Sequence, residues 1–134
     1  MQLATIVKNR FTVYAVKLNS DEDHDAFSLL SGRRNPSNKR EQSAVRSALA
    51  RISRLSIGPD VLSKTVCHAV SDDIWQITSD QIRILWFYDE GCLIICTHFF
   101  VKKTQKTPPG EIARAKRIRD AYFKDKANGD LATT

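Results

Sequence analysis

Residues 82–101 read IRILWFYDEGCLIICTHFFV and decide the fold of this chain. The stretch contains two long apolar runs, Ile82–Tyr88 and Cys92–Val101, which are separated by a short polar connection that ends in Gly91. A connection of this length between two β-forming runs predicts an antiparallel hairpin. Ile82–Tyr88 is apolar on both faces apart from Arg83, so we expect it at the centre of the sheet. A third run, Ile74–Thr78, lies close enough upstream to add another antiparallel strand.

The residues before this hairpin predict one strand, two helices and a weaker strand. Phe11–Leu18 is rich in β-branched and aromatic residues and predicts a strand. A turn and helix-cap signal at 19–21 precedes a short helix over Glu22–Leu30. Apolar residues spaced three and four apart predict an amphipathic helix from Pro36 to Leu55. Ser63–Ala69 is the weaker strand.

The C-terminal part predicts a basic helix followed by a loose tail. Thr107 is a good N-cap and Pro108 suits the first helical turn, so we expect a helix from there to about Lys124. Residues 127–134 show no periodic pattern and are expected to be disordered. The complete order of elements predicts an α+β fold of two layers, with an antiparallel sheet, in a single domain over residues 1–126.

Positive charge is concentrated near the C-terminus. The chain of 134 residues has a formal net charge of +6, and residues 102–126 carry nine basic and three acidic side chains, which is the whole of that excess. A patch of this kind is typical of proteins that bind nucleic acid, although an acidic protein partner would also suit it.

The remaining composition argues against several other classes. An odd number of cysteines, three, argues against a disulfide framework and for a reducing compartment. Cys96 and His98 share a strand face, but two ligands do not form a zinc site, so we expect no metal and no cofactor. There is neither a signal-peptide pattern nor an apolar run long enough to span a membrane, so we expect a cytoplasmic protein.

Two motifs resemble the RelE/HigB family of toxins from bacterial and phage toxin–antitoxin modules, in particular its phage-derived HigB-like branch. They are Lys102-Lys103-Thr104-Gln105-Lys106-Thr107-Pro108 and the strand segment Ile82-Arg83-Ile84-Leu85. The resemblance implies a RelE-like fold and a metal-independent endoribonuclease that cuts messenger RNA on the ribosome. It also implies a helix-turn-helix antitoxin as the partner that inhibits the toxin.

The resemblance assigns roles to the cations of both motifs. Arg83 is expected to hold a phosphate, the alternative being a structural salt bridge with Asp80 or Asp89. Lys103 matches a basic position implicated in RelE-like toxins and is expected to contact phosphate or to act as a base. The neighbours that would contribute to RNA binding are Lys102, Gln105 and Lys106.

Further candidates lie on either side of these motifs. His98 has the chemistry for proton transfer, although a lone histidine on an apolar strand is often a core residue. Tyr88 could stack on an RNA base or belong to the core. Arg114 and Arg117 on the basic helix would contact RNA phosphates.

One departure from the family pattern leaves two rival functions open. The strand before Arg83 ends in Thr78, where relatives often carry a basic residue. The first rival is a binding module for nucleic acid or protein on the same fold, without cleavage. The second is a structural or regulatory phage protein.

Overall fold

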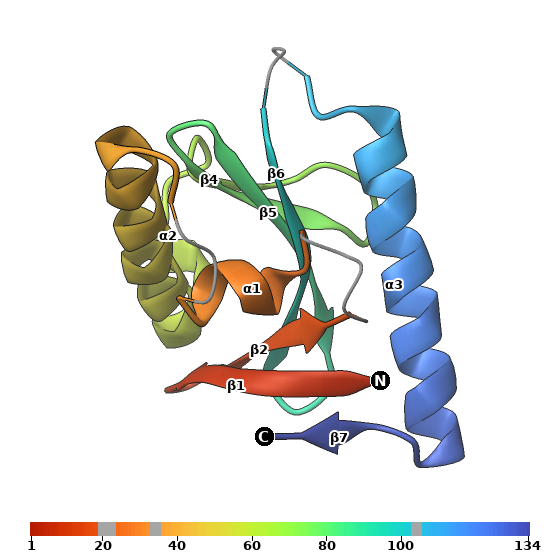
Figure 1. Ribbon diagram of the computed structural model, residues 1–134. Helices are drawn as coiled ribbons and strands as arrows, with labels where there is room; N and C mark the ends of the chain where they lie inside the picture. The colour runs from red at the N-terminus through yellow and green to blue at the C-terminus, as the bar shows by residue number, and fades with distance from the viewer. Residues whose placement is uncertain (19–23, 33–35, 103–105) are drawn as a thin grey trace.

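The fold is a seven-stranded mixed sheet with helices on both faces, seen here in a computed structural model that describes residues 1–18, 24–32, 36–102 and 106–134 (Figure 1). The predicted α+β class is confirmed. The strand order is β3-β4-β5-β6-β2-β1-β7, and the pairs β2–β6 and β1–β7 are parallel while the others are antiparallel. The bounds are β1 Gln2–Lys8, β2 Thr12–Lys17, α1 Ala26–Leu30, α2 Lys39–Ile57, η1 Pro59–Val61, β3 Cys67–Ala69, β4 Trp75–Ser79, β5 Ile82–Asp89, β6 Leu93–Val101, α3 Pro109–Asn128 and β7 Ala132–Thr133.

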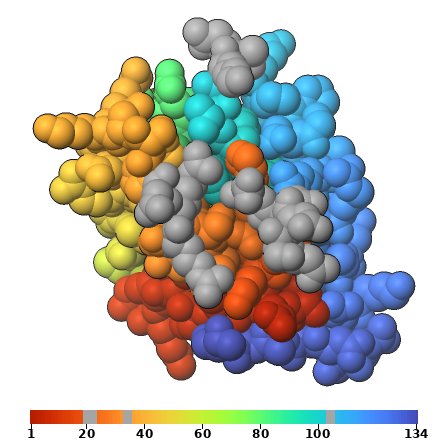
Figure 2. Space-filling view, in the orientation of Figure 1, coloured from red at the N-terminus to blue at the C-terminus, as the bar shows by residue number. Residues whose placement is uncertain are grey.

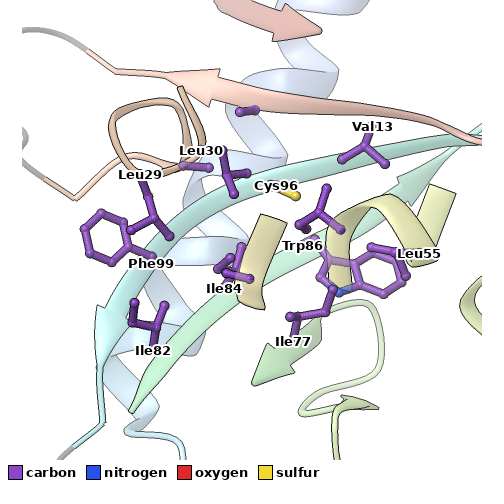
Figure 3. Close-up of a cluster of buried hydrophobic side chains, with 14 of the residues drawn as sticks. Val13, Leu29, Leu30, Leu55, Ile77, Ile82, Ile84, Trp86, Cys96 and Phe99 are labelled. Carbon is purple, nitrogen blue, oxygen red and sulfur yellow. The ribbon is translucent and has the colours of Figure 1, made fainter. Parts of the chain in front are cut away.

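The hairpin over residues 82–101 forms as predicted and its first strand lies inside the sheet. β5 pairs with β4 on one side and β6 on the other. Alternate residues of β5 enter two separate cores, because successive strand residues point to opposite faces. Ile84 and Trp86 face α1 and α2, whereas Leu85 and Phe87 face α3. Figure 3 shows the first of these cores, with Trp86 beside Leu55 of α2.

Helix α3 adds a layer that the sequence did not predict. Its buried residues Ala115, Ile118 and Tyr122 pack on the sheet face opposite α1 and α2. In Figure 1, α2 and α3 accordingly lie on either side of the sheet. The fold therefore has three layers, with α1 and α2 on one face of the sheet and α3 on the other, rather than the expected two. A helix on each face explains why β5 and β6 are apolar on both sides.

Several boundaries differ from the prediction for local reasons. Helix α2 begins at Lys39 because the Asn38 side chain accepts a 2.8 Å hydrogen bond from the Glu41 amide. Helix α1 begins at Ala26, after the N-cap Asp25, rather than at residue 22. The predicted cap at 19–21 lies outside the described residues. Strand β1 was not predicted at all.

The predicted disordered tail is wrong. Helix α3 continues to Asn128, and Gly129 ends it in the left-handed conformation, with φ of +74°. The chain then turns back, and β7 pairs in parallel with Gln2 and Leu3 of β1. The Thr134 amide donates a 2.9 Å hydrogen bond to the Leu3 carbonyl. Within the described ranges, no helix is both long and apolar enough to cross a membrane.

Candidate RNA-binding and catalytic site

A polar cleft lies beside the C-terminal part of β6, between the starts of α2 and α3. Strand β2 pairs with β6 only over Leu93–Cys96. Beyond Cys96, the segment before α1 lies against β6, and the Phe99 amide donates a 3.0 Å hydrogen bond to the His24 carbonyl. The cleft has a volume of about 680 Å³. Figure 2 shows the start of α2 in orange and that of α3 in light blue, on either side of the cyan surface of β6. The titratable side chains that line the cleft are His24, Arg40, Glu41, Asp80, Glu111 and Arg114.

Arg83 lies beside this cleft, on the α3 side of the sheet. It is half-buried, and its neighbours across the adjacent strands are Thr78 and Phe100, of which Phe100 lines the cleft. Its Nη1 donates hydrogen bonds of 2.5 and 3.1 Å to the carbonyls of Asp80 and Ile82. Burial lowers the pKa of Arg83, and the nearby Asp80 opposes that effect. Its Nε is buried and has no hydrogen-bond partner among the described residues.

The two carboxylates considered as salt-bridge partners of Arg83 are engaged elsewhere. Asp80 binds the guanidinium of Arg40 through two hydrogen bonds of 2.8 and 3.1 Å, which lower the pKa of Asp80. Asp89 lies at the other end of β5 and binds Tyr122 and Lys126. Arg83 is thus held in place through backbone carbonyls, which do not neutralise its charge, and the predicted phosphate contact stays a prediction.

His98 is completely buried between β6 and the first turn of α3. Its Nε2 lies 3.2 Å from Oε2 of Glu111, and its Nδ1 lies 3.1 Å from the hydroxyl of Thr97. Burial lowers the pKa of His98 to about 3, with smaller contributions from Arg114, His24 and Arg117. The contact with Glu111 is therefore a hydrogen bond from an uncharged imidazole rather than an ion pair.

The lysine motif is described only in part. Lys102 is half-buried, and its amide extends the β5–β6 pairing through a 2.7 Å hydrogen bond to the Gln81 carbonyl. It follows Phe100 by two residues, so strand alternation places it on the α3 side with His98 and Phe100. Lys106 is exposed. Lys103 and Gln105 lie outside the described residues, so their predicted roles stay predictions.

The connection into α3 is tied to the sheet by a contact that the sequence did not suggest. Thr107 was predicted as the N-cap, but the cap position is Pro108 and no side chain caps the helix. The Thr107 hydroxyl instead donates a 2.7 Å hydrogen bond to Oε1 of Gln76, a buried residue of β4. Gln76 breaks the apolar run of its strand, which was the available signal. This contact places the start of α3 over the face that carries His98 and Arg83.

Tyr88 is not brought together with the other candidates. It lies five residues after Arg83, about 16 Å along the strand, and faces the opposite side of the sheet. There it joins an aromatic cluster, with ring centroids 4.8 Å from Trp86 and 5.8 Å from Trp75. It is 39% exposed, so it retains a surface on which a ring could stack, but that surface is separate from the cleft.

The two arginines of the basic helix lie near the cleft. Arg114 lines it one turn after the start of α3, and Arg117 is exposed one turn further along. Both lower the pKa of His98, which shows that their positive charges act on the same region. The guanidinium of Arg119, further along α3, binds Asp73 and Asp120 at 3.2 and 3.1 Å.

Comparison with known proteins supplies a family. The sequence profile of the Gp49-like phage-derived proteins matches residues 38–120, which is more than half of the chain. The matched region begins at the N-cap of α2 and includes β4, β5, β6 and the half of α3 that lines the cleft. No curated protein matches the chain. The chain therefore belongs to the phage-derived Gp49-like protein family, a member of the RelE/ParE-like toxin superfamily.

Proposed function

We propose that this protein is the toxin of a type II toxin–antitoxin module, of the HigB-like branch, and that it cleaves messenger RNA on the ribosome in the cytoplasm. The observation that carries the proposal is Arg83, a half-buried cation whose Nε has no hydrogen-bond partner among the described residues. It lies beside a cleft that also receives Arg114. A guanidinium with spare donors is suited to the non-bridging oxygens of a phosphate.

The proposed chemistry needs no metal ion. A ribose 2′-hydroxyl attacks the adjacent phosphorus, and cations stabilise the charge that develops on the phosphate oxygens. Arg83 and Lys103 would supply that charge, while Lys102, Lys106, Gln105 and Arg117 would hold the RNA backbone. The helix-turn-helix antitoxin would inhibit the toxin by covering these cations or by displacing α3.

A non-catalytic binding module on the same fold is the second candidate, and two observations favour it. Thr78 lies directly opposite Arg83, where relatives often place a second cation. His98, the expected proton-transfer group, is buried and uncharged. A module of this kind would bind RNA or ribosomes with the same cations but leave the RNA intact.

Induced expression in a bacterial host tests the proposal. The wild-type protein should stop growth and create new messenger RNA 5′ ends, and Arg83→Ala should relieve both effects. Loss of one positioned donor at a developing charge costs about 10²–10³ in rate. Arg46→Ala is the matched control, because Arg46 is exposed on α2 and lies outside the cleft.

Two outcomes would contradict the proposal. If wild-type expression leaves growth and 5′ ends unchanged although the protein is folded and abundant, the toxin function is wrong. If growth stops while messenger RNA stays intact and the protein remains bound to ribosomes, the binding module is the better description. Circular dichroism of the purified variants checks that Arg83→Ala remains folded.

A further inference from the structure

Glu111 places a carboxylate in the cleft beside the proposed phosphate contacts. It lies in the first turn of α3, and its side chain is 27% exposed and lines the cleft. One oxygen, Oε2, is held by Nε2 of His98 at 3.2 Å. The other, Oε1, accepts no hydrogen bond from any described residue.

The protons of this pair can be assigned from the neutrality of His98. An uncharged imidazole carries one ring proton, and an ionised carboxylate can only accept. The proton therefore lies on Nε2 and points to Glu111. Nδ1 lies 3.1 Å from the hydroxyl of Thr97, which shares its single proton between this nitrogen and the Leu85 carbonyl, also at 3.1 Å. The buried His98 ring is held at both nitrogens, so it fixes the orientation of the Glu111 carboxylate. Because the ring stays uncharged, it does not take up a proton that Glu111 accepts.

The other two carboxylates of the cleft are committed to structural contacts. Asp80 is bound by two nitrogens of Arg40. Glu41 closes the N-terminal turn of α2 by accepting from both the amide and the hydroxyl of Ser37. Of the three carboxylates, Glu111 is the one that lies on α3, over the sheet face that carries Arg83 and His98.

We propose that Glu111 is the proton acceptor for RNA cleavage and that His98 is the residue that positions it, an inference that rests on the proposed function. The Glu111 carboxylate takes the proton of the ribose 2′-hydroxyl as the 2′-oxygen forms its bond to phosphorus. The bond from phosphorus to the 5′-oxygen of the next nucleotide breaks, and that oxygen takes a proton from a water molecule. The products are a 2′,3′-cyclic phosphate and a 5′-hydroxyl end, and Glu111 then returns its proton to solvent.

The surrounding charges fit this assignment. Arg114 follows Glu111 by one helical turn, so a cation accompanies the carboxylate where the phosphate would lie. The titratable and charged groups that face Glu111 from the packed elements and across the cleft are His98, Arg114, His24, Arg40, Glu41 and Asp80. The exposed part of Glu111 exchanges its proton with solvent after each cycle, which the fully buried His98 cannot do.

The test compares single-turnover cleavage of a defined messenger RNA on purified ribosomes by wild-type protein, Glu111→Gln, Glu111→Asp and the control Glu90→Gln. General-base catalysis typically contributes about 10²–10⁴-fold, so Glu111→Gln should lose at least a hundredfold in rate. Its affinity for ribosomes should be unchanged, since the amide replaces the carboxylate at equal size. The wild-type rate should fall towards acidic pH, and this acidic limb should vanish in Glu111→Gln and persist in Glu111→Asp. Glu90 is exposed in the β5–β6 turn, and its variant should match wild type.

His98 is tested by variants that separate positioning from folding. His98→Gln keeps a donor near Glu111, whereas His98→Leu removes it. His98→Leu should lower kcat with little change in KM and keep the acidic limb, and His98→Gln should recover part of the loss.

Each result decides the inference. If wild type cleaves and Glu111→Gln keeps its rate within twofold, or keeps the acidic limb, Glu111 is not the acceptor while the proposed function stands. If wild type does not cleave, the proposed function and this inference both fail. Should Glu111→Gln fail to fold, Glu111→Asp decides. A cleavage rate about a hundredfold below wild type that still falls towards acidic pH supports the assignment. A cleavage rate equal to that of wild type overturns it.

Discussion

The hydroxyl of Tyr122 on α3 donates a 2.5 Å hydrogen bond to the carboxylate of Asp89, at the end of β5. Lys126, one turn further along the helix, binds both oxygens of the same carboxylate at 3.0 Å. The Asp89 side chain is only 2% exposed. This cluster holds the C-terminal half of α3 against the sheet, although the apolar stripe of the helix is modest.

Tyr122→Phe should therefore destabilise the fold. It leaves a buried carboxylate with one donor fewer, and hydrogen bonds to charged groups contribute about 1.5–3 kcal/mol. Denaturant unfolding should show a loss of that size in the free energy of unfolding. Tyr14→Phe is the matched control, because no described hydrogen bond involves the Tyr14 hydroxyl, and its effect should stay within about 0.5 kcal/mol. Equal losses in both variants would contradict the role of Asp89.

The same cluster predicts a defined pH dependence. The hydrogen bonds from Tyr122, Lys126 and the Glu90 amide outweigh the burial that opposes them, so the pKa of Asp89 is lowered. Its contribution is present above the unfolded pKa of about 3.9 and is lost as the pH falls through the lower folded pKa. Burial and the Asp89 carboxylate raise the pKa of Tyr122, so its contribution is present below about 10 and is lost at higher pH. Asp89→Asn should flatten the acidic side of the stability profile, and an unchanged profile would contradict this.

Two glycines at opposite ends of α3 should respond to alanine with opposite signs. Gly129 has φ of +74°, and an added Cβ would meet no atom within 4 Å, so Gly129→Ala should cost about 1 kcal/mol from backbone conformation alone. Gly110 also has open space around its Cβ position but lies inside the helix, where Gly110→Ala should stabilise by about 0.5–1 kcal/mol. Thermal unfolding of both variants checks this. Destabilisation by Gly110→Ala would show that the start of α3 needs a glycine.

The hairpin and α2 could be predicted from sequence because their patterns are local. The two apolar runs over Ile82–Val101 with their short polar connection, and the three-and-four spacing of α2, can each be recognised within a short stretch of sequence. The terminal strands could not be predicted in the same way. β7 has two residues and exists only because Gly129 turns the chain back to β1. Strand β1 has β-branched Thr5, Ile6 and Val7, a signal that was present but short.

The candidate site was predictable in its cations but not in its carboxylate. Arg83 and Arg114 were expected from sequence, and the structure places them beside and inside one cleft. Glu111 was not among the candidates, because an acidic residue in the first turn of a helix is accounted for by the helix dipole alone. Its importance depends on His98, thirteen positions earlier. The contact exists because α3 packs on the sheet face opposite α1 and α2, which no local sequence pattern encodes.

The three cysteines should differ in reactivity. Burial raises the pKa of Cys67 to about 11 and that of Cys96 to about 12, whereas Cys92 is exposed in the β5–β6 turn. Since the thiolate is the reactive form, an alkylating reagent at neutral pH should modify Cys92 alone in the native protein. Mass spectrometry should find one adduct under native conditions, three in denaturant and none in native Cys92→Ser. Rapid native modification of Cys96 would contradict the burial of β6.

The salt dependence of RNA binding should report how many phosphates the basic helix contacts. Each phosphate neutralised on a single strand contributes a slope of about −0.7 to the plot of log affinity against log salt. Replacing Arg114 and Arg117 by Gln should therefore make that slope shallower by about 1.4, as measured by fluorescence anisotropy with a labelled single-stranded RNA. Arg119→Gln is the control, because Asp73 and Asp120 already bind that guanidinium and its removal should change the slope less. If the double variant keeps the wild-type slope, the charge of this face serves a protein partner, and an acidic antitoxin segment becomes the ligand to measure next.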